Sequence, residues 1–170
     1  MSIPSIAATK DWYVHARGDH PEVRAKFFEM IRTLDGYKAH VVIAKKDLDV
    51  FKNRHNGNAD EFYFDILYRL LHGKLKDKNC CYRLHLSHRG NNSFHRFEGA
   101  VKKALKGEGT PNDLNYVLEI VPGRSMPECS IIDYLIWAVQ RKLLVGESRY
   151  FDAMRDKFET IVDLYSEGTQ

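Results

Sequence analysis

Cysteine is scarce in this sequence, and the placement of its three residues excludes two classes of protein. Cys80, Cys81 and Cys129 are an odd number and two of them are adjacent, so they do not form the disulfide framework of a small secreted domain. No Cys-x-x-Cys pair is present, which removes a common signature of a structural zinc site. This use of cysteine is typical of a reducing compartment, and we therefore expect a cytoplasmic protein.

Long apolar runs and the familiar catalytic motifs are also missing. The sequence contains no stretch of about 20 apolar residues, so we expect no transmembrane helix and no membrane partner. Its first residues lack the basic-then-apolar order of a signal peptide. It has no Gly-rich phosphate loop, no Gly-x-Ser-x-Gly and no His-Glu-x-x-His. These absences argue against nucleotide hydrolysis by a P-loop and against serine hydrolysis.

The composition is that of a folded globule. Hydrophobic residues make up 44% and aromatic residues 12% of the 170 positions, which is enough chain and enough apolar side chain for a real core. We expect one domain over residues 1–170, with the small and polar residues 1–10 loosely held.

Charge is unevenly distributed although the formal net charge is only +3. Residues 45–106 carry fourteen basic and seven acidic side chains, a net charge of +7, whereas residues 107–170 carry six basic and eleven acidic ones, a net charge of −5. A basic middle can supply a surface that faces phosphates. The alternative is that these lysines and arginines only keep helix faces soluble.

Strand-like and helix-like segments alternate along the chain, which predicts an α/β layer fold with a substantially parallel sheet. The apolar centre of residues 39–44 indicates a strand that is buried on both faces. The apolar face predicted for the helix at residues 21–35 consists of Val23, Phe27, Met30, Ile31 and Leu34. The predicted strands are residues 11–16, 39–44, 80–87 and 114–121, the predicted helices are residues 21–35, 59–71, 93–106, 127–144 and 148–165, and residues 53–58 are a predicted loop.

The helix predicted over residues 127–144 is the element around which the chain is organised. Pro127 suits a first helical turn, because proline has no N–H to donate and its φ is already helical. The helix is apolar over most of its circumference, so we expect it to be well buried. Its predicted buried stripe is Cys129, Ile132, Ile136, Val139 and Leu143.

One carboxylate, Asp133, stands in the middle of this apolar helix. A buried aspartate needs a partner, a metal ion or neutralisation, because burying a bare charge is costly. Two interpretations remain open. Asp133 is either a structural acid that bonds a lysine, a backbone N–H or water, or it is a metal-binding or general-base carboxylate.

Two further groups of polar residues are candidates for a site. His15 and Asp19 flank a turn at the end of a predicted strand, where functional groups often lie, although Asp19 has the alternative role of a helix cap. A cationic set surrounds one predicted strand, turn and helix, whose N-terminus near Ser93 adds a positive dipole end. Phosphate binding is one interpretation of this set, and zinc is less favoured, since the histidine spacing is not a standard ligand pattern. The set consists of Arg83, His85, His88, Arg89 and Arg96.

Several short motifs, taken in order, resemble a bacterial family that is known only as domain of unknown function 3800. The closing motif is the most specific, with Asp133 at the aspartate of the family signature and Ser130 where glutamine is usual. The strand-to-helix turn with His15 and Asp19 also matches the family pattern. The matching segments are Val14-His15-Ala16 with Asp19, residues 41–45, residues 84–90, and Pro127 to Asp133 followed by Tyr134, Trp137-Ala138 and Arg141.

The resemblance implies an RNase H-like fold, in which a mixed sheet is flanked by helices. The family usually opens with a strand that carries Asp-Glu-Ser-Gly, and this chain shows no such motif, so we expect an N-terminally shortened form. By analogy, clustered carboxylates in such folds hold Mg²⁺ or Mn²⁺ at a phosphodiester site. Asp133 is then the residual catalytic and metal-binding acid, and Glu119 and Glu98 are the candidates to replace the missing carboxylates. The residues implied to face phosphates are Lys45, Arg83, His88 and Arg89.

Two functions follow as expectations. The first is a nucleic-acid-binding protein or a metal-dependent, nuclease-like hydrolase of phosphodiesters, whose site is either working or degenerate, since Asp133 is the one clear carboxylate. The second is a non-catalytic interaction module that completes its sheet with a second copy or with a partner chain, because missing strands leave unpaired backbone groups.

Overall fold

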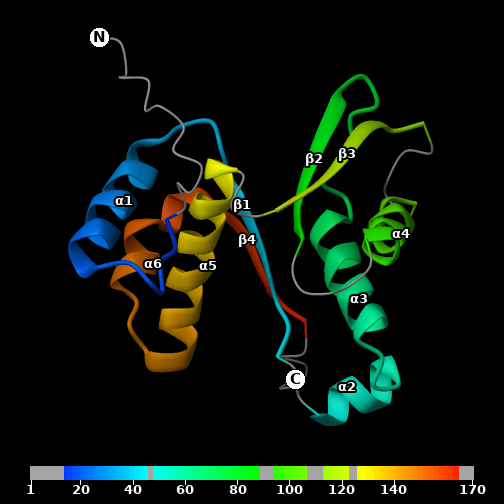
Figure 1. Cartoon of the computed structure of the whole chain (residues 1–170), viewed down its shortest axis with the longest axis horizontal. Coiled ribbons are helices and arrows are strands. Elements are labelled where there is room, and N and C mark those ends of the chain that lie inside the picture. The colour runs from blue at the N-terminus through cyan, green and yellow to red at the C-terminus, as the bar shows by residue number, and fades with distance from the viewer. Residues whose placement is uncertain (1–13, 46–47, 89–93, 107–112, 123–125, 165–170) are drawn as a thin grey trace. The chain divides into compact units, whose positions relative to one another are not determined.

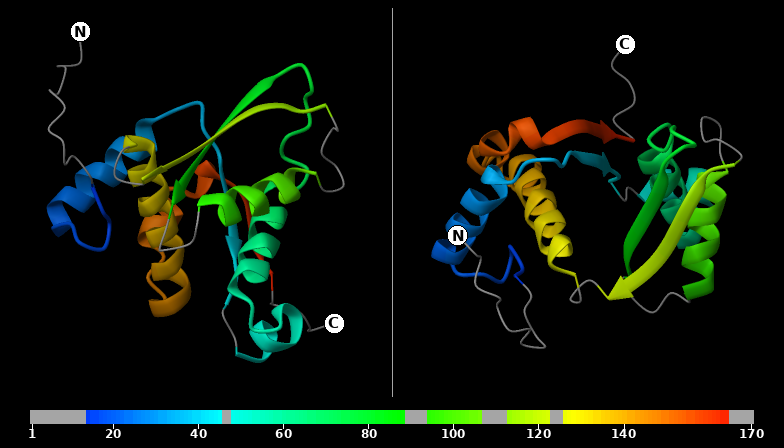
Figure 2. Two further views of the ribbon diagram at one scale, coloured as in Figure 1. Left: turned by 45° about the vertical axis from the view of Figure 1, so that its right-hand side comes forward. Right: turned by 90° about the horizontal axis from the view of Figure 1, so that it is seen from above.

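The computed structural model describes residues 14–45, 48–88, 94–106, 113–122 and 126–164 (Figures 1 and 2). It shows a mixed α/β protein, as the alternating pattern predicted. The helices are α1 (Pro21–Thr33), α2 (Leu48–His55), α3 (Ala59–Leu71), α4 (Phe94–Leu105), α5 (Pro127–Val145) and α6 (Arg149–Ala153), and the strands are β1 (Ala39–Ile43), β2 (Cys81–His88), β3 (Asn115–Pro122) and β4 (Phe158–Asp163). None of the helices in these ranges is long and apolar enough to cross a membrane.

The chain divides into two compact units. The first unit consists of residues 1–37 and 121–157, and the second consists of residues 38–120 and 158–170. The chain therefore leaves the first unit after α1, builds the second, and returns to the first for α5 and α6.

An aromatic cluster holds the first unit together. The ring of Tyr134 on α5 lies 4.4 Å from that of Phe27 and 5.1 Å from that of Phe28, both on α1. Phe28 also approaches Tyr150 on α6, with 4.8 Å between ring centroids. Tilted aromatic pairs at these distances add to the stabilisation that comes from burying the rings. This cluster fixes which side of α5 faces α1.

The predicted starts of α1 and α5 are confirmed, but of the predicted buried stripe of α5 only Val139 is buried. Ile132, Ile136 and Leu143 remain 53%, 37% and 52% exposed. The residues that α5 buries are Ser130, Tyr134, Leu135, Ala138 and Val139. Because α5 is apolar nearly all round, spacing alone does not choose a face, and the contact with Phe27 and Phe28 decides it.

The same correction applies to α1. Phe27 and Ile31 of its predicted apolar face are buried, but Val23, Met30 and Leu34, which the pattern also placed inside, are 46%, 41% and 37% exposed. Phe28, which the pattern left out, is only 5% exposed.

The second unit has a two-layer core in which β2 and most of β3 pack against α3 and α4 (Figure 2). Alternation along the strands separates the two sides of this sheet, because successive strand residues point to opposite faces. The inward side chains pack on a buried cluster on and around α3 and α4, whereas Arg83, His85, Val117 and Glu119 are exposed. The buried cluster is Leu67, Leu75, Val101, Ala104 and Leu105, and the strand residues packed on it include Tyr82, Leu84, Leu86, Tyr116 and Leu118.

The predicted strand at residues 39–44 and its parallel pairing are confirmed by β1, which pairs in parallel with β4. All five residues of β1 are half-buried, so the predicted burial on both faces is only partial. In this register Val41 lies beside Ile161 and Val42 beside Val162. The helix predicted over residues 148–165 is wrong in its second half. Up to residue 164, only the short α6 is α-helical in this segment. A 3₁₀ turn then covers Arg155–Lys157, and β4 follows it. The run Thr160-Ile161-Val162 is β-branched, and pairing with β1 lets it form a strand.

Three other predictions are changed or left open. Helix α2 occupies residues 48–55, so the loop predicted at 53–58 is shorter. Residues 14–20 form a turn and not the end of a strand, and residues 11–13 lie outside the described part of the chain. The strands in the described ranges form two sheets of two strands each, β1 with β4 and β2 with β3. The single RNase H-like sheet therefore stays a prediction.

Candidate functional site

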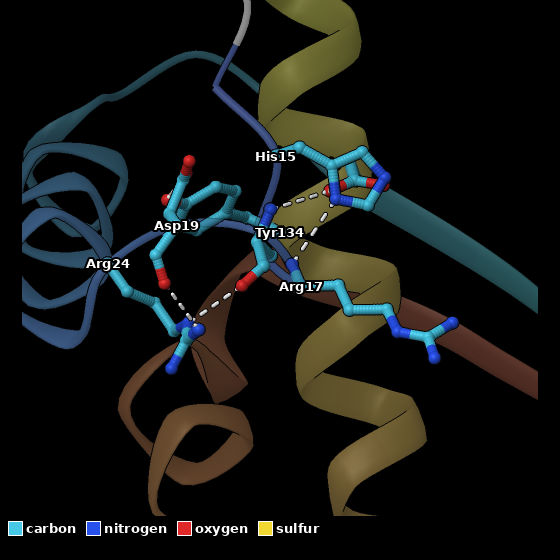
Figure 3. A network of polar contacts seen from close by, with 7 residues as sticks. His15, Arg17, Asp19, Arg24 and Tyr134 are labelled. Carbon is cyan, nitrogen blue, oxygen red and sulfur yellow. Dashed lines mark hydrogen bonds and ion pairs between the residues drawn. The ribbon is translucent and has the colours of Figure 1, made fainter.

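The candidate site lies in the first unit, where the turn at residues 14–20 meets α5 at Asp133. One oxygen of this carboxylate, Oδ2, accepts the backbone N–H of Ala16 at 2.9 Å and lies 3.5 Å from Nδ1 of His15 (Figure 3). The Asp133 side chain is 11% exposed and the His15 side chain is 46% exposed. A nearly buried carboxylate is thus placed beside an imidazole that solvent can reach.

Arg24 on α1 holds the turn that carries His15 in place through hydrogen bonds. Its Nε donates to the carbonyl oxygen of Ala16 and its Nη2 donates to that of Asp19, both at 2.8 Å. The guanidinium also lies 4.6 Å from the ring centroid of Trp137 on α5. Ala16 itself is fully buried. Because one arginine bonds both ends of the turn and stacks on α5, the N–H of Ala16 is held in place to bond Asp133.

Asp19 has a structural partner. Its Oδ2 accepts the hydroxyl hydrogen of Tyr134 at 2.5 Å. Burial, and secondarily this bond to a carboxylate, raises the pKa of Tyr134 above its usual value near 10. The predicted alternative role of Asp19 as a helix cap is wrong, since the N-cap of α1 is His20, whose side chain accepts the N–H of Glu22.

The hydrogen bonds indicate which protonation state of His15 this geometry fits. The backbone N–H of Arg17 donates to Nδ1 of His15 at 3.3 Å. An acceptor Nδ1 belongs to the neutral imidazole that carries its proton on Nε2. The single lone pair of Nδ1, which accepts this N–H, lies 3.5 Å from a carboxylate oxygen, so a cation bound by both atoms would replace the hydrogen bond from Arg17. Two electron-pair donors at this separation are suited to a shared cation.

The donor set for a metal ion is small. Within the described residues, no group of three or more His, Cys, Asp or Glu side chains is arranged to hold a metal. Asp133 and His15 supply one oxygen and one nitrogen. A cation bound by this pair would take its remaining ligands from water or from a phosphate.

The structure brings together only part of the predicted site. Asp133, His15 and Asp19 gather in the first unit. Lys45 and Arg83 belong to the second unit, where both are exposed, at the end of β1 and on β2. The side chain of His88 and the whole of Arg89 lie outside the described residues.

The two carboxylates that the sequence offered as substitutes for missing acids have partners of their own. Glu119 lies 3.1 Å from Nδ1 of His85, across the β2–β3 sheet. Glu98 lies 2.6 Å from the ammonium of Lys102 and 4.0 Å from His95, both on α4. The hydrogen bond from Lys102 lowers the pKa of Glu98. His85 and His95 are thus each paired with a separate carboxylate.

Arg24 and the backbone of Ala16 are the parts of the site that sequence reasoning missed. Arg24 looks like any exposed arginine of a first helical turn, and a backbone N–H carries no sequence signal. Trp137, on which Arg24 stacks, was noticed only as part of a motif. Comparison of the chain with protein-family models, with curated proteins and with solved structures found no match in any of the three.

Proposed function

We propose that His15 and Asp133 bind a divalent cation, Mg²⁺ or Mn²⁺, and that the protein binds nucleic acid and processes phosphodiesters on an RNase H-like fold. The observation that carries the proposal is the 3.5 Å separation of His15 Nδ1 and Asp133 Oδ2, because it joins two ligand atoms from opposite ends of the chain. Carboxylate oxygen suits both ions. A cation held by these two residues would supply activation of water and neutralisation of charge on a phosphate.

The residues of the chain itself have distinct roles in this proposal. The N–H of Ala16, fixed by Arg24, orients the Asp133 carboxylate. His15 supplies nitrogen on the solvent side of that carboxylate. The exposed side chain of Arg17 extends from the same turn and adds positive charge for a phosphate oxygen (Figure 3). Asp19 and Tyr134 hold the turn against α5 and need no contact with substrate.

Titration with Mn²⁺, followed by calorimetry, tests the metal site directly. We expect the wild-type protein to bind Mn²⁺, Asp133→Asn to lose binding, and His15→Gln to bind at least about tenfold more weakly, since each variant removes one ligand. Asparagine keeps an oxygen for the N–H of Ala16, so Asp133→Asn should keep the fold.

Glu119→Gln is the matched control, because it neutralises the carboxylate of another partly exposed His–carboxylate contact, His85–Glu119. It should leave Mn²⁺ binding unchanged. Absence of binding to the wild-type protein, or equal binding by wild type and Asp133→Asn, would contradict the proposal.

The basic segment, residues 45–106, makes a separate prediction about nucleic acid. Replacing Arg83 with glutamine should weaken binding of a single-stranded oligonucleotide and reduce the slope of log K against log salt by about 0.7 for one lost phosphate contact. Arg69→Gln is the control, because Arg69 has the same charge but lies 3.9 Å from Asp65 on its own helix. Fluorescence anisotropy at several salt concentrations measures both slopes, and an unchanged slope for Arg83→Gln removes this residue from the interface.

A second candidate function is the non-catalytic interaction module, which one observation favours. The β1–β4 sheet has two strands, yet it is parallel, and Ile161 and Val162 on β4 are 38% and 45% exposed. Parallel sheets usually have both faces covered, and two strands alone are marginally stable. We propose that, in this case, a strand from a second copy or from a partner chain extends the sheet. A stable complex without Mn²⁺ affinity would support this candidate over the first.

A further inference from the structure

Two adjacent thiols lie on the surface of the second unit. Cys80 and Cys81 are both exposed and neither forms a disulfide. Cys81 is the first residue of β2, and it belongs to the exposed face of the β2–β3 sheet, as Arg83 does. Cys80 lies in the bend before the strand, so the rule that places neighbouring strand residues on opposite faces does not apply to it. A ligand in solvent can therefore reach both sulfur atoms.

A hydrogen-bonded turn holds the two thiols. The backbone N–H of Cys80 donates to the carbonyl oxygen of Asp77 at 3.2 Å, and the Cys80 thiol donates to Oδ2 of the Asp77 carboxylate at 3.1 Å. The N–H of Asp77 in turn donates to the hydroxyl oxygen of Tyr82 at 2.9 Å, and Tyr82 packs on the core of the second unit. Because the turn before the thiols is bonded to the core residue that follows them, the backbone that carries both thiols is held in place before any ligand binds.

A disulfide is not the favoured product of two neighbouring cysteines. Consecutive Cα atoms are about 3.8 Å apart, which is shorter than the separation of about 4.4–6.8 Å that an unstrained disulfide requires. An ion that binds both sulfur atoms without joining them directly relieves this constraint, because the sulfur atoms can then stand farther apart. The covalent geometry therefore favours binding of an ion over oxidation of the pair.

The kind and number of the donor atoms select the ion. Thiolate sulfur is a soft ligand, which favours Cu⁺ and Zn²⁺ over Mg²⁺ and Mn²⁺. A structural zinc ion takes four protein ligands. In the ranges that the structure describes, no group of three or more His, Cys, Asp or Glu side chains is placed to supply them. Two thiolates, in contrast, are a complete ligand set for a two-coordinate Cu⁺ ion.

We propose that Cys80 and Cys81 bind one Cu⁺ ion between their two thiolates. When the ion binds, two S–H bonds break, two Cu–S bonds form and both protons pass to the solvent, while copper keeps its oxidation state. The complex carries one negative charge, and the exposed residues Lys74, Lys76 and Lys78 of the preceding segment supply positive charge near it. The proposal does not rest on the cation site proposed in the first unit.

Competition with a coloured Cu⁺ chelator, under anaerobic conditions, tests the pair. We expect the reduced wild-type protein to bind one Cu⁺ per chain. Cys80→Ser and Cys81→Ser should each bind it at least about a hundredfold more weakly, since an intramolecular second Cu–S bond is lost. Cys129→Ser is the matched control, because it also leaves two cysteines but keeps the adjacent pair, and it should match the wild-type protein. No binding by the wild-type protein, equal weakening by all three variants, or one Cu⁺ shared by two chains would overturn the proposal.

Thiol alkylation, read residue by residue with mass spectrometry, locates the ion on the chain. Cu⁺ should slow the reaction of iodoacetamide with Cys80 and Cys81 and leave the rate at Cys129 unchanged, because a metal-bound thiolate is no longer a free nucleophile. This measurement uses the wild-type protein, so it does not depend on the folding of any variant. Protection of Cys129 alone, or no protection of the adjacent pair, would contradict the assignment.

Discussion

Replacing Tyr134 with alanine should lower the free energy of unfolding by about 3–5 kcal/mol, the range for truncating a large buried aromatic side chain. Tyr134 is fully buried, and its ring contacts those of Phe27 and Phe28 at 4.4 and 5.1 Å. Its hydroxyl also bonds Asp19, so truncation removes both the centre of the aromatic cluster and a tie to the turn that carries His15. Urea denaturation measures the loss.

Two controls separate the contributions of Tyr134. Tyr134→Phe keeps the ring and removes only the donor to Asp19, so it should cost about 1.5–3 kcal/mol, the range for a hydrogen bond to a charged group. Tyr63→Ala truncates a tyrosine that is 46% exposed and should cost well under half of the Tyr134→Ala loss. If Tyr63→Ala and Tyr134→Ala cost the same, the aromatic cluster is not the core of the first unit.

The pH dependence of stability provides a further readout of the Tyr134 hydroxyl. Its pKa is raised in the folded protein, first by burial and then by the bond to Asp19, so the folded state retains a proton that the unfolded state loses near pH 10. The stabilisation is complete below that pH and declines as the pH rises beyond it. Melting temperatures of the wild-type protein should fall more steeply above about pH 10 than those of Tyr134→Phe.

Local signals predicted where helices begin, but they did not predict how the helices face one another. Pro21 and Pro127 mark the starts of α1 and α5, because a proline at the first helical turn costs no hydrogen bond. The buried side of α5 depends on Phe27 and Phe28, which lie more than 100 positions away along the chain. On an almost uniformly apolar helix, periodicity gives no information about such a partner.

Residues 158–163 show the same limit of prediction from local sequence patterns. Phe158, Ile161 and Val162 have helical spacing as well as strong strand propensity, so the sequence supports either structure. Parallel pairing with β1, which is distant in sequence, decides in favour of the strand. Tertiary pairing overrides a local pattern whenever the two local alternatives are nearly balanced.

The candidate site was predictable in its parts and not in its assembly. Asp133 stood out because a carboxylate in an apolar helix needs a partner, and His15 because it lies at a turn. Their contact spans 118 positions of the chain and depends on Arg24, which has no distinguishing sequence context. Predicted phosphate-facing residues such as Lys45 and Arg83 remain separate expectations, because they lie in the other unit.

The second large effect is expected at Phe28, which the periodicity of α1 left outside the core. Phe28→Ala should lower the free energy of unfolding by about 3–5 kcal/mol. The side chain is 5% exposed, and its ring lies within 4.8–6.0 Å of the rings of Tyr134, Trp137 and Tyr150. One ring thus joins α1 to both α5 and α6, and its removal leaves a cavity among groups that cannot easily collapse.

Val23→Ala is the matched control on the same helix, because the sequence pattern placed Val23 in the core and the structure leaves it 46% exposed. It should change the free energy of unfolding by no more than about 0.5 kcal/mol. The pair of variants therefore distinguishes two orientations of α1 by urea denaturation alone. A large loss at Val23 with a small loss at Phe28 would mean that α1 is rotated about its axis. In that case Arg24, which neighbours Val23, could not reach the carbonyl groups of Ala16 and Asp19. The hydrogen bonds that hold the turn and place His15 beside Asp133 would then not form.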